Sequence, residues 1–106
     1  MPDAEGHPAP AEMTLRTVLA ALADPLRYEV VRALARDADG AARTCASFGF
    51  PVSKSTLSHH FRVLRESGLI RQVDRGNSRA ATLRRDEIDA RFPGLVQLVR
   101  DNPAVP

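Results

Sequence analysis

Apolar residues recur at helical spacing in the first part of the chain. Leu15, Val18, Leu19 and Leu22 follow an i, i+3, i+4, i+7 pattern, which predicts a first amphipathic helix. The dipeptide Asp24-Pro25 predicts the start of a second helix. An aspartate there can accept hydrogen bonds from the free amides of the first turn, and proline suits a first position that needs no amide partner. The buried stripe of this helix is predicted at Leu26, Val30, Ala33 and Leu34.

A short third helix is predicted at residues 42–48. A turn is predicted after it, because Pro51 disfavours helix at the preceding residue. The segment SKSTLSHHFRVLRESGLI (53–70) then predicts a helix that begins at Ser53 or Ser55 and stops near Gly68. At ~100° per residue, one side of this helix is apolar and the opposite side is polar. The apolar side holds Leu57, Phe61 and Leu64, and the polar side holds Ser55, Ser58, His59 and Arg62.

A β-hairpin is predicted next, with strands at residues 69–73 and 79–83 around the polar turn of residues 74–78. Residues 1–12, rich in Pro, Ala and acids, predict a disordered tail. A last helical region is predicted from Asp86, interrupted at Pro93, and residues 102–106 predict a C-terminal tail. The fold class is therefore mainly α with a small β-hairpin (α+β), in one domain over residues 13–101. Helix, turn, helix and hairpin in this order outline a winged helix-turn-helix.

Charge is distributed unevenly along the 106 residues, although the net charge is only +2. Residues 53–85 hold eight Lys or Arg against two acids, a net charge of +6, whereas the segments on either side are each net −2. Such clustering is typical of a protein that binds a polyanion, and the predicted partner is double-stranded DNA. The alternative is a small α+β domain whose basic, polar face is only solvated.

Three segments carry a resemblance to a known family: LADPLRYEVVRALA (22–35), SKSTLSHHFRVLRESGLI (53–70) and RGNSRAATL (75–83). Together they resemble the arsenic-repressor (ArsR/SmtB) family of bacterial winged-helix regulators. The resemblance implies a dimeric repressor that binds an imperfect palindrome and dissociates when an effector binds. It implies base contacts by Ser55, Ser58 and His59, and contacts to the backbone or adjacent bases by Lys54, Thr56 and Arg62. Arg75 and Arg79 would then serve the wing.

The resemblance raises the question of a metal sensor, because many relatives bind metals. One metal site of the family uses a Cys-x-Cys pair, whereas this chain has Cys45-Ala46-Ser47. Soft metals are bound by two or more thiolates, and only one is available here. Another uses Asp and His ligands in the last helix, but residues 86–106 contain no histidine. His59 and His60 are adjacent, so on a helix they diverge and do not chelate one ion together. We therefore expect no metal site and no cofactor, and the effector stays unknown.

Other chemistry has weaker support in the sequence. Cys45, the single cysteine, fits a reducing cytoplasm, and it is either a small buried residue or a thiol-responsive switch. Ser58-His59 lacks a third group to orient it, and no glycine-rich phosphate loop is present, so an enzyme is not expected. No apolar run reaches the ~18 residues of a membrane span.

Pairing of two chains is expected from the apolar stripes at the two ends of the domain. A core this small does not easily cover both, so we expect them to meet across a two-fold axis, although packing within one chain is the alternative. The predicted dimer residues are Leu15, Val18, Leu22, Phe92, Leu95, Val96 and Val99. A rival for the whole function is a winged-helix module that binds a protein partner, since fold does not determine function.

Overall fold

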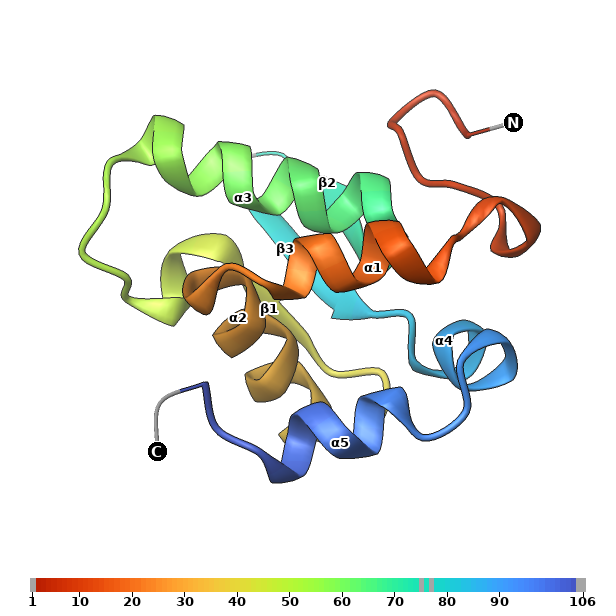
Figure 1. Cartoon of the computed structure of the whole chain (residues 1–106). Coiled ribbons are helices and arrows are strands. Elements are labelled where there is room, and N and C mark those ends of the chain that lie inside the picture. Colours follow the sequence, from red (N-terminus) through yellow and green to blue (C-terminus); the bar gives the residue numbers. More distant parts are fainter. Residues whose placement is uncertain (1, 75, 77, 105–106) are drawn as a thin grey trace.

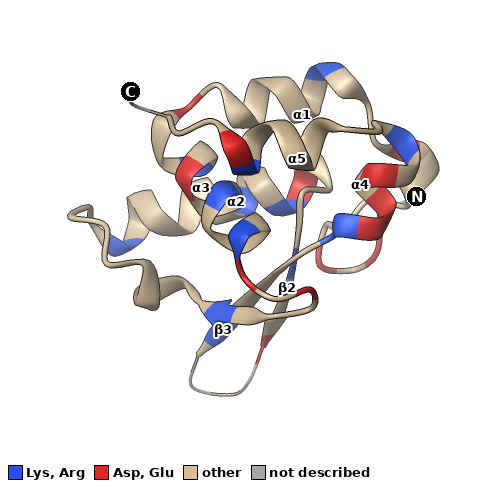
Figure 2. Ribbon diagram, turned by 90° about the horizontal axis from the view of Figure 1, so that it is seen from below, with Lys and Arg blue, Asp and Glu red and all other residues tan. Residues whose placement is uncertain are grey.

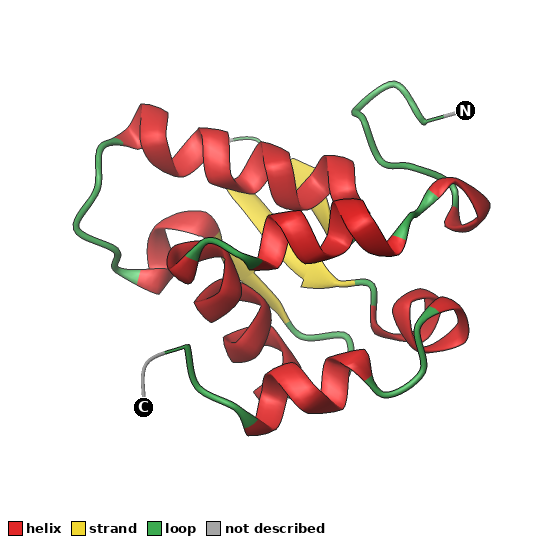
Figure 3. Ribbon diagram, viewed as in Figure 1, coloured by secondary structure: helices red, strands yellow, loops and turns green. Residues whose placement is uncertain are grey.

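The computed structural model describes residues 2–74, 76 and 78–104. The helices are α1 (Leu15–Leu22), α2 (Pro25–Arg36), α3 (Lys54–Ser67), α4 (Arg85–Arg91) and α5 (Leu95–Asp101). The strands are β1 (Ala42–Thr44), β2 (Ile70–Asp74) and β3 (Arg79–Leu83), and two 3₁₀ turns are η1 (Pro10–Glu12) and η2 (Cys45–Phe48). Helices α1 and α3 lie side by side with the sheet behind them, and α5 packs on α2 (Figures 1 and 3). The predicted winged helix-turn-helix fold is confirmed.

Local capping signals act as the sequence predicts. The Asp24 carboxylate accepts hydrogen bonds from the amides of Leu26 and Arg27 at 2.9 and 3.1 Å, and Pro25 is the first residue of α2. These bonds satisfy amides that the helix itself leaves without partners. The core that α2 helps to close contains Val18, Val30, Phe61, Leu64, Leu69, Ile70 and Ile88, each at most 1% exposed.

The sheet has three antiparallel strands in the order β1-β3-β2. The hairpin of β2 and β3 matches the prediction, but the predicted third helix at residues 42–48 is reduced to the short 3₁₀ helix η2 at Cys45–Phe48. The chain forms β1 before η2, with Arg43 opposite Ala81. Backbone partners supplied by β3 replace the hydrogen bonds of a local helix. Gly49, at φ 69°, then ends η2 in the left-handed conformation that favours glycine.

The N-terminal segment packs on the edge strand β2, which differs from the predicted disordered tail. The His7 side chain is buried, and its Nε2 accepts a hydrogen bond from the backbone amide of Gln72 at 3.0 Å. Its Nδ1 lies 2.9 Å from the Asp3 carboxylate. The carbonyl of Pro8 accepts a hydrogen bond from Arg84 at 2.8 Å. An edge strand exposes backbone amides that need hydrogen-bond acceptors, and His7 provides an acceptor for one of them.

The predicted dimer residues divide into two groups. Val18, Leu22, Val96 and Val99 are at most 8% exposed within a single chain, so the alternative of packing in the monomer holds for them. Val96 and Val99 are covered because α5 lies directly on α2. Phe92 and Leu95 are half-buried against the same core. Leu15 remains exposed, together with Leu19 on the same helix and Leu98 on α5, at 46%, 49% and 63%.

Candidate nucleic-acid interface

Helix α3 is delimited by side-chain and glycine caps that the sequence supplies. The Ser53 hydroxyl accepts a hydrogen bond from the amide of Thr56 at 3.2 Å. At the other end, Gly68 has φ 92°, and a Cβ there would lie 2.6 Å from the Met13 side chain. Glycine is therefore required both by the left-handed backbone and by the close approach of Met13. These caps fix the length and the rotation of the polar face.

The two sides of α3 are separated as the sequence predicts. Phe61 and Leu64 are buried in the core, and Leu57 is half-buried. The exposed side carries the hydroxyls of Ser55, Thr56 and Ser58, the His59 ring and the Arg62 guanidinium. One side thus anchors the helix, and the other presents hydrogen-bonding groups of short and medium length to solvent.

A shallow hollow joins this face to the hairpin. Ser55, Ser58, His59, Arg62, Arg65 and Arg79 line it. Five of the eight residues predicted to contact DNA therefore lie together, and Arg79 comes from β3 rather than from the helix. Strands β2 and β3 extend toward the side of the molecule opposite α1 and α5 (Figure 2). The hollow therefore combines polar groups of the helix with a cation of the wing.

Of the other three residues predicted to contact DNA, two lie near this hollow and one is not among the residues that the structure describes. Lys54 faces a neighbouring cavity, which Ser58 and Arg79 also line. The hydroxyl of Thr56 is 3.0 Å from that of Ser53, at the N-terminal end of the helix. Arg75, predicted to serve the wing, lies outside the described residues.

Two of the exposed groups already interact with each other. Arg62 Nη2 is 3.3 Å from His59 Nδ1, and Arg62 Nε is 4.0 Å from the Glu66 carboxylate. Both partners in the Arg62–Glu66 pair are well exposed, so the pair contributes little to stability. The Arg62 guanidinium is consequently held over the helix surface by weak contacts that a stronger anion, such as a phosphate, can replace.

A second group of residues, which the sequence did not identify, positions α3 on α2. Arg27 Nη1 lies 3.0 Å from His60 Nδ1, and Arg27 Nε donates to the carbonyl of Ala21 at 2.8 Å. The Asp24 carboxylate is 3.8 Å from the same His60 ring atom. The only sequence signal was that His60 falls nearer the apolar side of its helix. The pairing itself joins residues 33 positions apart and needs the tertiary fold.

Arg65 is another residue whose position the sequence left open. Its Nη1 donates to the Gln72 side-chain oxygen at 2.5 Å, which links α3 to β2 beneath the hollow. The Gln72 amide nitrogen in turn donates to the Cys45 thiol at 3.6 Å. Burial raises the pKa of Cys45 above its ordinary value, so the thiol is protonated at neutral pH and is a poor nucleophile.

The described residues contain no cluster of three or more His, Cys, Asp or Glu side chains arranged to hold a metal ion. No helix among them is long and apolar enough to cross a membrane.

Comparison with known proteins supports the same interpretation of the geometry. Residues 22–73, from the end of α1 through β2, match a family described as a helix-turn-helix domain. A solved ArsR family transcriptional regulator superposes with a TM-score of 0.64 at 26% identity, covering 79% of this chain and 90% of that one. The chain is an ArsR-type winged helix-turn-helix regulator.

A second solved structure agrees with this assignment. An ArsR-like transcriptional regulator from Rhodococcus sp. RHA1 gives a TM-score of 0.59 at 26% identity, covering 82% of this chain and 80% of that one. No curated protein matches the chain. Both neighbours are transcriptional regulators rather than enzymes. Within the ArsR-type fold, α3 is the second helix of the helix-turn-helix and the β2–β3 hairpin is the wing.

Proposed function

We propose that this ArsR-type regulator is a homodimeric repressor that binds an imperfect palindromic operator through α3. The observation that supports this proposal is the hollow in which Ser55, Ser58, His59 and Arg62 of α3 meet Arg79 of the wing. A helix of this width fits the major groove, and side chains of these types bind base edges and phosphates.

Each residue has a proposed role that follows from its place on the helix. Ser55, Ser58 and His59 face outward near the N-terminal end of α3, which is the end that enters the groove, and they contact bases. Lys54, Thr56 and Arg62 contact the backbone or adjacent bases, assisted by the free amides of the helix N-terminus. Arg79, together with Arg75, holds the wing on the phosphates.

The proposed dimer uses the apolar side chains that remain exposed. Leu15 and Leu19 share one face of α1, and Leu98 is exposed on α5. Strands β2 and β3 extend away from both helices, so pairing through α1 and α5 leaves the described part of the wings free (Figure 2). A two-fold axis there would set the two α3 helices about 34 Å apart, one turn of DNA.

Fluorescence anisotropy with duplexes from the upstream region of the protein's own gene tests the DNA-binding proposal, with unrelated duplex as competitor. We expect tight binding that resists the competitor and weakens with salt by a slope of about −0.9 per phosphate contacted. Binding that the competitor and salt abolish equally at every duplex tested, and no binding at all, would both contradict sequence-specific recognition. A protein-interaction module would show neither the competitor resistance nor the salt slope.

Sedimentation equilibrium tests the dimer separately. Leu19→Glu places a charge on the exposed apolar face and is expected to give a folded monomer, whereas Val52→Glu, an exposed apolar position on the loop before α3, is the control for a charge placed elsewhere. A parent that sediments as a monomer would contradict the dimer. A Leu19→Glu variant that remains dimeric would move the interface away from α1.

A further inference from the structure

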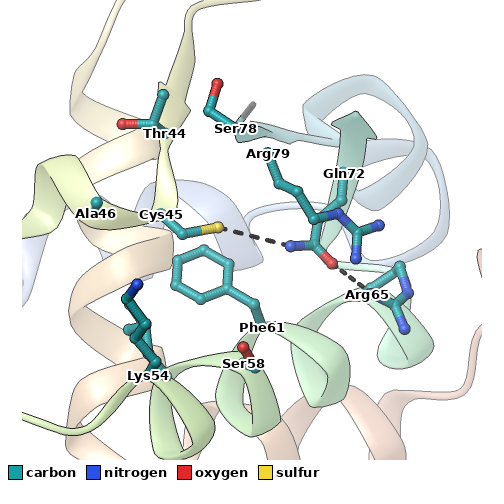
Figure 4. Close-up of a pocket in the computed structure, with 11 residues that line it drawn as sticks. Thr44, Cys45, Ala46, Lys54, Ser58, Phe61, Arg65, Gln72, Ser78 and Arg79 are labelled. Carbon is teal, nitrogen blue, oxygen red and sulfur yellow. Dashed lines mark hydrogen bonds between the residues drawn. The ribbon is translucent and has the colours of Figure 1, made fainter. Parts of the chain in front are cut away.

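A cavity of about 420 Å³ lies between α3, η2 and the wing. Its size is within the range of sites that bind small molecules. Residues from five elements line it, among them Cys45 and Ala46 of η2, Phe61 of α3 and Gln72 of β2 (Figure 4). The cavity adjoins the hollow on the DNA-facing side, and the two share Ser58, Arg65 and Arg79.

The inner wall of the cavity is apolar and neutral. Phe61, Leu57 and Ala46 line it, and Figure 4 shows the Phe61 ring next to the Cys45 thiol. The Cys45 thiol adds a further uncharged group, since burial keeps it protonated. An aromatic or branched aliphatic group in this space would be removed from water against carbon and sulfur atoms.

The rim of the cavity is positively charged. Lys54, Arg65 and Arg79 line it, and no carboxylate lines it among the described residues. Within that part of the chain, Lys54 and Arg79 form no ion pair with an acidic side chain. Figure 4 shows the Phe61 ring between Lys54 on one side and Arg79 on the other. An anion at the mouth therefore meets cations that carry no competing carboxylate.

A buried amide completes the site. The Gln72 side chain is 4% exposed, and Arg65 fixes its orientation by donating to its oxygen. The amide nitrogen consequently points into the cavity, where it donates a hydrogen bond to the Cys45 sulfur at 3.6 Å. A thiol is a weak acceptor, so an oxygen atom of a ligand would make a stronger hydrogen bond there.

We propose that this cavity binds a small organic acid whose compact apolar body rests on Phe61 and whose carboxylate meets Lys54 and Arg79. An inorganic anion would satisfy the cations but leave the apolar wall uncovered. A neutral hydrocarbon would cover the wall but gain nothing from the rim. An aromatic or branched aliphatic monocarboxylate fits both.

Occupancy of the cavity opposes DNA binding, a consequence that rests on the proposed function. Lys54, Ser58 and Arg79 line the cavity and are also proposed DNA contacts. The ligand carboxylate and a DNA phosphate then compete for the same cations. The organic acid is therefore an effector that releases the operator, at a site formed by the recognition helix and the wing.

The first experiment measures the ligand without DNA. Benzoate is titrated into the full-length protein and followed by two-dimensional ¹H–¹⁵N NMR, with benzyl alcohol as a neutral probe of similar shape. We expect saturable shifts at the Gln72 side-chain amide and at Cys45, Ala46 and Arg79. Benzoate should bind about tenfold or more tightly than benzyl alcohol, as expected for a charge-assisted contact. Equal affinity of the two probes, or shifts that map to another surface, would overturn the proposal.

A matched pair of variants locates the site. Ala46 is an exposed residue that lines the cavity, so Ala46→Phe places a ring inside it. Ala90→Phe adds the same ring at an exposed position of α4, which does not line the cavity. We expect Ala46→Phe to abolish saturation by benzoate while circular dichroism stays parental, and Ala90→Phe to bind as the parent does. Parental benzoate binding by Ala46→Phe would overturn the assignment.

The second experiment adds operator DNA, with benzoate exchanged for chloride at equal ionic strength in the control. Loss of operator affinity with benzoate, and retention with chloride, supports competition. Benzoate binding without any change in operator affinity overturns the competition and leaves the site itself established. A protein that binds benzoate but no DNA contradicts the proposed function rather than the site.

Discussion

The guanidinium of Arg27 on α2 lies 3.0 Å from Nδ1 of His60 on α3 and donates a hydrogen bond to it. The same guanidinium donates to the carbonyl of Ala21 through Nε. One side chain therefore joins the end of α1 and the recognition helix. Arg27 is half-buried and does not line the hollow, so we expect it to influence DNA binding only through the placement of α3.

Arg27→Leu is expected to reduce operator affinity without changing the salt slope. The substitution removes both hydrogen bonds but no phosphate contact, and it should cost about 1–3 kcal/mol of folding stability. Arg62→Leu is the matched comparison, because it removes a cation from the exposed face and should reduce the slope by about 0.9. Anisotropy titrations at several salt concentrations measure both. A reduced slope for Arg27→Leu would place that guanidinium on the DNA instead.

His59→Ala is expected to relax sequence preference rather than general affinity. If the ring contacts a base, the loss at the operator should be about 1–3 kcal/mol, with little change on unrelated duplex. Arg79→Ala should instead weaken every duplex alike and reduce the salt slope by about 1. Because His59 and Arg62 lie 3.3 Å apart, the double variant is needed to separate their contributions. Operator binding by His59→Ala that equals the parent would remove His59 from the recognition face.

Local signals in the sequence predicted the elements that carry the site. Ser53, Gly68 and the Asp24-Pro25 pair act on neighbouring residues, and the structure uses each of them as a cap or first turn. The alternation of polar and apolar residues in α3 likewise depends on one helix alone. The polar face of α3 was therefore predictable before any tertiary contact was known.

Features that depend on distant partners were not predictable from these signals. The three-residue strand β1 exists because β3 pairs with it, whereas the sequence predicted a helix over the whole of residues 42–48. The N-terminal segment is ordered by a hydrogen bond between residues 65 positions apart, from Gln72 to His7. Composition alone, rich in Pro and Ala, gave no sign of this bond. The covering of Val96 and Val99 by α2 similarly required the fold.

His7→Ala is expected to release the N-terminal segment from the sheet edge. The variant removes the acceptor of the Gln72 amide and the partner of Asp3, and should cost about 1–2 kcal/mol. Hydrogen exchange measured by NMR should show the Gln72 amide exchanging faster than in the parent. His59→Ala, an exposed histidine, is the control and should leave that amide unchanged. Unchanged protection in His7→Ala would mean that another group covers the strand edge.

The buried Arg84 makes folding stability depend on pH through Glu87. Hydrogen bonds from Arg84, and further ones from Arg71, hold the pKa of Glu87 below its ordinary value of 4.5. A carboxyl whose pKa is lowered by folding stabilises the protein above its unfolded pKa. That stabilisation is lost as the pH falls through the lower, folded pKa. The loss therefore occurs on the acid side, below about pH 4.5.

Glu87→Gln should be less stable than the parent by about 1–2 kcal/mol at about pH 7, because the Arg84 charge then lacks a carboxylate. The difference should shrink as the pH falls below 4.5 and through the lowered pKa of Glu87, because the parental carboxyl then becomes protonated. Urea unfolding followed by circular dichroism measures both. Glu66→Gln is the control, since Glu66 lies 4.0 Å from Arg62 in an exposed pair that contributes little. If the parent and Glu87→Gln lose the same amount of stability as the pH falls, this carboxyl does not cause the pH dependence.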